Sequence, residues 1–250
     1  MLNLQPYADP QYFIILLLAL LPLAIGLYFG KRIAWYEVLV SLVFIFLMFD
    51  GEKYHEGIAL IIYMIWQWLL VWAYTLYRKK YNQTWVFYVT TILAILPLVL
   101  IKVAPVANWL QVTTLLGFMG ISYLTFRSVG MVMEIRDGSI QEFNPWLFLR
   151  FMLFMPTISS GPIDRYRRFV KDVEKAPTHD KYLEMLGKAV KYLFIGFLYK
   201  FIVSHALGTV LMPNVERMAI ISAHAQGGWS WWIIAYMYIY GLNLFFDFAG

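Results

Sequence analysis

The residues best suited to form a functional site follow one another in a short polar stretch that interrupts an apolar run. Pro156 and Pro162 each lack a backbone N–H and crowd the preceding turn, so a regular helix cannot continue through both. The polar side chains and the glycine around them are Ser159, Ser160, Gly161, Asp164 and Arg165. Broken backbone at membrane depth is tolerated only where protein or a water-filled cavity surrounds it. We expect these residues, with Pro162, to shape a substrate path, but a membrane helix that ends at Pro156 and turns at the interface fits equally well.

A few further polar side chains stand inside otherwise apolar segments. They are Arg127, Lys200, His205 and Asp247. An ionisable group within a membrane span is costly and normally faces the protein interior, so we expect these residues to support the path. Three of them also have a plain structural explanation: Arg127 and Lys200 would extend to the membrane interface, and His205 would bind only a local carbonyl. The functional alternative for Arg127 is a pair with Glu134, seven residues on and on the same helical face.

The sequence contains no familiar hydrolase, nucleotide-binding or metalloprotease motif. Its four histidines are scattered, and none stands at metal-ligand spacing from another: His55, His179, His205 and His224. The absence of cysteine excludes disulfides, a thiolate nucleophile and cysteine-based metal sites. We therefore expect no metal and assign no catalytic residue from the motifs.

The composition is that of an integral membrane protein of the all-α class. Apolar residues make up 61% of the 250 positions and charged residues only 14%. The net charge of +5 fits a bias of basic residues towards cytoplasmic loops better than nucleic-acid binding. No Lys or Arg precedes the first apolar stretch, 12–29, so it is a retained span rather than a signal peptide.

The apolar segments predict about seven membrane spans in a single membrane domain, 1–250. A crossing helix needs roughly 20 residues, and the fitting segments are 12–29, 33–49, 57–77, 85–101, 109–133, 192–212 and 229–249. Basic connectors after the first and third spans place the N-terminus of this multi-pass protein outside the cell membrane. Residues 213–228 then form an external connector.

The segment 146–160 decides how the chain continues. The loop after it, 164–191, carries eight Lys and Arg residues, which orientation rules keep in the cytoplasm. Because 146–160 is short and contains Arg150, we expect it to be a re-entrant or interfacial element. Within the loop, apolar residues at helical spacing predict an amphipathic surface helix that meets acidic lipid headgroups or an acidic protein. These residues are Leu183, Leu186, Val190 and Leu193.

Four stretches carry a resemblance to a known family. They are 121–127, 151–165, 196–201 and 244–250, of which Ser160-Gly161-Pro162-Ile163-Asp164-Arg165 is the most specific. Together they resemble the membrane-bound O-acyltransferase family, and most closely its Gram-positive members that modify teichoic acids. The resemblance runs along the whole chain. It implies the N-terminal part of a ring of membrane helices around a thinned centre, with a tunnel that joins the two sides.

The resemblance also implies an activity and partners. D-Alanine would arrive as a thioester on the phosphopantetheine arm of a cytoplasmic D-alanyl carrier protein, with no cofactor bound directly, and would end as an ester on lipoteichoic acid outside. Membrane lipids are the remaining partner. The family's catalytic histidine has Trp before it and Gly after it, and no histidine here does. We therefore expect that histidine beyond residue 250, and a chain that is inactive alone.

Two other functions compete with acyl transfer. A transporter or flippase for a cell-wall precursor would also use a broken span, although such proteins often show two corresponding breaks and this chain has one. A non-catalytic membrane scaffold is the second, if the protein truly ends at Gly250. Substrate movement without acyl chemistry would identify the transporter, and carrier binding without transfer the scaffold.

Overall fold

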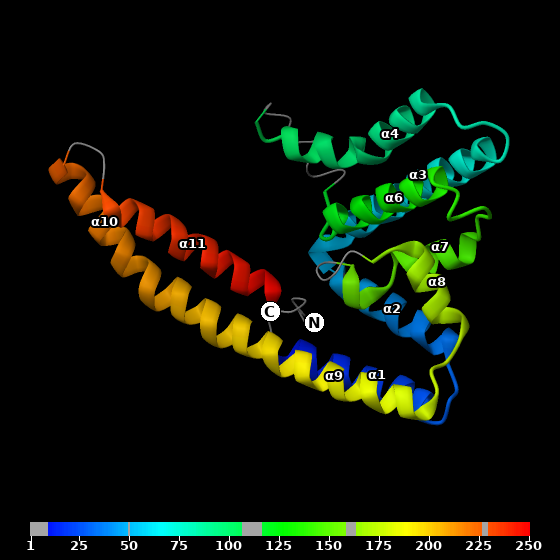
Figure 1. The fold of residues 1–250 in the computed structure, drawn as a ribbon, viewed down its shortest axis with the longest axis horizontal. Helices are drawn as coiled ribbons and strands as arrows, with labels where there is room; N and C mark the ends of the chain where they lie inside the picture. The colour runs from blue at the N-terminus through cyan, green and yellow to red at the C-terminus, as the bar shows by residue number, and fades with distance from the viewer. Residues whose placement is uncertain (1–9, 50, 107–116, 159–163, 227–229) are drawn as a thin grey trace. The chain divides into compact units, whose positions relative to one another are not determined.

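A computed structural model describes residues 10–49, 51–106, 117–158, 164–226 and 230–250 (Figure 1). Every regular element in these ranges is a helix, which confirms the all-α prediction. The chain divides into two compact units, Met1–Pro177 and Thr178–Gly250, each with its own packing. We describe each unit by itself.

The described residues of the first unit form seven α-helices and two single turns of 3₁₀-helix, η1 (Gly51–Lys53) and η2 (Met155–Thr157). The helices are α1 (Pro10–Tyr28), α2 (Ala34–Met48), α3 (Tyr54–Arg78), α4 (Thr84–Val103), α6 (Ile121–Arg136), α7 (Pro145–Met152) and α8 (Tyr166–Glu174). The second unit is built from α9 (His179–Phe197), two π-helical stretches, η3 (Leu198–Ser204) and η4 (Ala206–Leu211), α10 (Met212–Gln226) and α11 (Trp231–Ala249).

Several of these helices are long and apolar enough to cross a bilayer. Within the described ranges they are Tyr54–Arg78, Thr84–Val103, His179–His224 and Trp231–Ala249, while α1 and α2 are apolar but shorter. The expected spans 57–77, 85–101 and 229–249 coincide with α3, α4 and α11. The chain is a polytopic membrane protein.

The expected connector 213–228 is wrong for most of its length, because the chain remains helical up to Gln226. Pro213 is the second residue of α10 and follows the π-helical stretch η4 without a break in the helix. The side-chain Nδ2 of Asn214 donates to the carbonyl oxygen of Val210 at 2.8 Å, one turn earlier.

Within the expected segment 146–160, the described residues 146–158 form no crossing helix. Asn144 caps the start of α7, where its Oδ1 accepts hydrogen bonds from the backbone N–H groups of Trp146 and Leu147 at 3.0 and 3.2 Å. The helix then ends after eight residues, at Met152. At a rise of 1.5 Å per residue, α7 is only about 12 Å long, far short of a bilayer.

The core of the first unit lies between α3, α6 and α7. Tyr63 of α3 and Leu124 of α6 are fully buried there, and so is Phe148 of α7. Phe151 packs against the rings of Tyr166 and Phe169, with centroids 5.5 and 5.4 Å away, and thereby joins α8 to this core. The core thus fixes both helices that flank the interrupted segment.

Candidate functional site

Arg127, on α6, binds the point where α7 ends. Its side chain is almost completely buried, with only 2% of the residue exposed. Nη1 donates to the carbonyl oxygens of Phe151 and Met152 at 3.0 and 3.1 Å. Nη2 donates to the carbonyl oxygen of Thr157 at 2.5 Å and to the Thr157 hydroxyl oxygen. One guanidinium group therefore holds both sides of the break at residues 153–154.

The physical reason is that a helix leaves its last carbonyls without intrahelical partners. Phe151 and Met152 are the last two residues of α7, and their carbonyl oxygens are buried beside Arg127. A cation is favourable at a helix C-terminus, and the planar guanidinium presents several donors in fixed directions. Arg127 also lies over the Phe151 ring, 5.5 Å from its centroid.

Both sequence explanations for Arg127 are therefore wrong. A residue this deeply buried does not extend to an interface, and its partners are backbone carbonyls rather than Glu134. Glu134 instead accepts a hydrogen bond from the backbone N–H of Arg167, in the first turn of α8, at 3.2 Å. An acid is favourable at a helix N-terminus. Two residues of α6 thus hold the end of α7 and the start of α8.

The predicted path residues fall on the segment between these two anchors. Ser159, Ser160, Gly161 and Pro162 lie outside the described residues, and that part of the prediction stays a prediction. Asp164 is partly exposed, and its Oδ1 accepts a hydrogen bond from the backbone N–H of Arg165 at 2.8 Å.

Two neighbouring side chains complete this end of the segment. The exposed Arg165 is the N-cap residue, directly before the first residue of α8. Burial raises the pKa of the next residue, Tyr166, to about 12, so its hydroxyl stays protonated at neutral pH and is no general base. The Tyr166 hydroxyl therefore suits positioning or binding rather than proton transfer.

A second polar cluster was missed by the sequence reasoning. Glu37, in the apolar helix α2, is 8% exposed and forms ion pairs with Arg150 of α7 at 3.2 Å and with Arg32 at 3.3 Å. One turn further along α2, the hydroxyl oxygen of Ser41 accepts a hydrogen bond from the backbone N–H of Met155 at 3.5 Å. The signal that could have revealed this cluster is an acid inside an apolar span and Arg150 inside another apolar segment.

The other predicted supporting residues belong to the second unit. Lys200 and Asp247 form an ion pair there, with Nζ and Oδ1 2.7 Å apart. One turn on, the Ser204 hydroxyl donates to Oδ1 of Asn243 at 2.9 Å. His205 is exposed, and it is not brought into this pair. The structure therefore pairs Lys200 with Asp247 in the second unit, whereas Arg127 belongs to the first unit.

The π-helical stretch η4 and helix α11 approach each other closely beside these polar contacts. A Cβ atom added to Gly208 would lie only 3.0 Å from Oδ1 of Asn243, which is tighter than most real contacts. Small residues at such positions let membrane helices approach each other closely. The glycine thus explains how the polar side chains of α11 reach the π-helical stretch.

We expect the Lys200–Asp247 pair to couple the stability of the two helices that carry it. Lys200→Met or Asp247→Leu alone leaves one charge unpaired, which is costly within a membrane span. The double variant removes both charges, so we expect its yield of monodisperse protein in size-exclusion chromatography to exceed that of either single variant. A double variant whose loss equals the sum of the two single losses would show that the pair contributes nothing.

Within the described ranges, no three His, Asp or Glu side chains are grouped so that they could hold a metal ion. The four histidines lie on separate elements, and the Arg127 guanidinium donates its hydrogen bonds to the carbonyl oxygens of Phe151, Met152 and Thr157. What the site offers is a buried guanidinium at the end of α7 and a carboxylate at the start of α8, on either side of an interruption in the helix. Such a feature can line a path or seat a partner.

No family model matches the chain. Curated proteins do match it along essentially its whole length, and all three carry the name teichoic acid D-alanyltransferase. The chain is 51% identical to the protein of Lacticaseibacillus rhamnosus over 100% of the chain and 62% of that relative. It is 49% identical to the Streptococcus thermophilus protein over 99% of the chain and 59% of the relative. It is 44% identical to the Bacillus subtilis protein over 99% of the chain and 62% of that relative.

The chain therefore spans about three-fifths of the length of the curated relatives that it matches. Along essentially its whole length, the chain is homologous to these three proteins, each named teichoic acid D-alanyltransferase.

Proposed function

We propose that this chain forms part of a membrane O-acyltransferase that esterifies lipoteichoic acid with D-alanine. The observation that carries the proposal is the coincidence of two features. Arg127 and Glu134 hold the two ends of the stretch 151–165, which contains the motif most specific for the acyltransferase family. Broken backbone at membrane depth is tolerated where it lines a water-filled cavity, which supports a substrate path at this place.

In the proposed reaction, the D-alanyl group arrives as a thioester on the phosphopantetheine arm of a carrier protein. A hydroxyl oxygen of the acceptor forms a bond to the carbonyl carbon, the carbon–sulfur bond breaks, and the hydroxyl proton ends on the released thiol. The step requires a general base and a preorganised site for the developing oxyanion. We assign neither of these roles to a described residue; this chain would contribute the path and the docking face.

The proposed docking face is α8, with the residue before it. Its exposed basic side chains are Arg165, Arg167, Arg168 and Lys171. The guanidinium of Arg168 lies 3.8 Å from the carboxylate of Asp164 and 4.0 Å from that of Asp172. Ion pairs that are this exposed to solvent contribute little to stability. The basic groups therefore remain available to bind a partner. A basic surface would attract an acidic carrier protein by complementary charge. This face would lie in the cytoplasm, with the N-terminus of the chain outside.

A complementation experiment tests the proposal. In a Gram-positive strain without its own D-alanyltransferase gene, this chain would replace the matching segment of the Lacticaseibacillus rhamnosus relative. We expect the hybrid to restore D-alanine esters on lipoteichoic acid, measured as D-alanine released by mild alkali. A hybrid that inserts into the membrane but restores no ester contradicts the proposal.

In the same hybrid, we expect Asp164→Ala or Arg165→Ala to lower the ester content strongly while the protein still inserts. Asp164 orders the start of α8, and Arg165 presents the exposed charge beside the predicted path. Lys175→Ala, an exposed basic residue just beyond α8, is the matched control and should leave the ester content unchanged. Normal ester content in both the Asp164 and the Arg165 variant would show that these two residues do not form part of the substrate path.

A further inference from the structure

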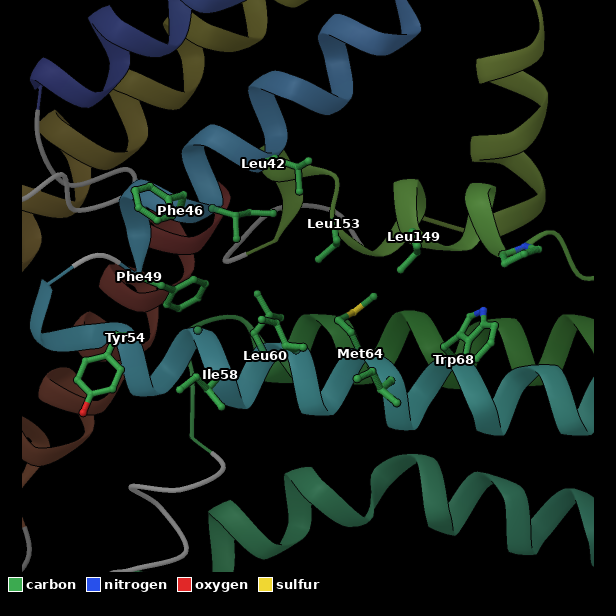
Figure 2. A pocket seen from close by; sticks show the side chains of 15 residues that line it. Leu42, Phe46, Phe49, Tyr54, Ile58, Leu60, Met64, Trp68, Leu149 and Leu153 are labelled. Carbon is green, nitrogen blue, oxygen red and sulfur yellow. The ribbon is translucent and has the colours of Figure 1, made fainter.

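A large apolar cleft opens along the first unit, between α2, α3 and α7. Its volume is about 700 Å³, within the range of small-molecule sites in proteins. Figure 2 shows Leu42 and Phe46 on one side, Ile58 and Met64 on another, and Leu149 on α7. Apart from the Tyr54 hydroxyl and the Trp68 indole nitrogen, its side chains are hydrocarbon or thioether, so a hydrocarbon chain is the chemistry that fits.

The cleft adjoins a smaller cavity with a charged wall. This second cavity, of about 200 Å³, shares Leu42, Leu149 and Leu153 with the first and adds Glu37 and Arg150. An occupant that fills both would thus have an apolar chain followed by a polar end. The shared leucines define where one environment changes into the other.

The charges at that end are not balanced. Arg150 and Arg32 both pair with the single carboxylate of Glu37, which leaves one excess positive charge. The Arg150 side chain is only 7% exposed, and its buried Nε makes no hydrogen bond with the part of the chain that the structure describes. A buried donor without an acceptor is costly, and an anionic oxygen would satisfy it.

We propose that this cleft binds an anionic phospholipid, with one hydrocarbon chain between α2, α3 and α7 and its headgroup at Arg150. The headgroup oxygens accept from the Arg150 guanidinium and neutralise the charge excess that Arg32 helps to create. A zwitterionic lipid offers the same chain but no net negative charge. The inference concerns a bound lipid and does not depend on the proposed acyl transfer.

The test is a lipid titration of the purified protein in mild detergent, followed by native mass spectrometry. We expect phosphatidylglycerol to bind about tenfold more tightly than phosphatidylcholine, as charge-assisted hydrogen bonds predict. Arg150→Gln should abolish this preference. Glu37→Gln should increase it, because it frees two guanidinium groups from their carboxylate. If Arg150 and Glu37 only stabilised the fold, both substitutions would change the preference for phosphatidylglycerol in the same direction.

A cleft-filling variant separates this site from the general lipid surface. Leu42→Trp places a large ring in both cavities and should weaken the binding of both lipids. Ile92→Trp, at an exposed position of α4 that lines neither of these two cavities, is the matched control and should bind like the parent protein. Equal affinity for the two lipids, or a Leu42→Trp variant that behaves like the control, overturns the proposal. So does a second protein copy that occupies the cleft in a cross-linking experiment.

Discussion

Arg127→Gln is expected to abolish most of the D-alanine ester formed by the hybrid transferase. The substitution removes the cation from the end of α7, and an amide cannot reach the carbonyl oxygens of Phe151, Met152 and Thr157 together. Each buried acceptor left without a donor costs about 1–3 kcal/mol. Two such unpaired acceptors would lower the fraction of molecules in which residues 153–154 adopt the observed conformation by more than about tenfold.

The conservative variant makes this prediction sharper. Arg127→Lys keeps the charge but presents an ammonium group that lacks the fixed fork of the guanidinium, so we expect intermediate ester content. Arg217→Gln, at an exposed position of α10, is the control for the loss of one arginine. Ester content and membrane insertion would be measured in parallel. Full ester content in Arg127→Gln would mean that the break is ordered without its guanidinium.

Glu37→Ala is expected to lower thermal stability more than any surface substitution in the first unit. It leaves the guanidinium of Arg150 buried without its carboxylate, and breaking a buried pair in this way typically costs about 3–5 kcal/mol. For a protein of this size, the melting midpoint should fall by about 10 °C. The measurement is the fraction of monodisperse protein that remains after heating in detergent.

The same pair offers a rescue experiment. In Glu37→Leu/Arg150→Leu both charges are replaced by apolar groups, and such replacements are often neutral or stabilising. We therefore expect the double variant to melt close to the parent protein. Glu174→Ala, an exposed acid on α8, controls for the loss of one carboxylate. If Glu37→Ala melts like the parent, or the double variant melts like Glu37→Ala, the ion pair does not stabilise the unit.

The local features of the fold could be predicted from the sequence. Apolar length predicted α3, α4 and α11, and the short segment with Arg150 inside it predicted that 146–160 is no crossing helix. The expected connector 213–228 was wrong for most of its length, because the helix continues through Pro213 to Gln226.

The sequence by itself therefore determined the class of protein, the resemblance and the presence of an interruption near Pro156, since these follow from composition and from residues close together in the chain. The helix ends earlier than the prolines indicated, at Met152. Only the tertiary structure decided what the charged residues do. Arg127 binds carbonyl oxygens up to 30 positions away, and Glu37 binds a guanidinium 113 positions away. Residues so far apart in the chain are joined by the packing of helices, and the partner of a buried charge is set by which groups that packing leaves within reach.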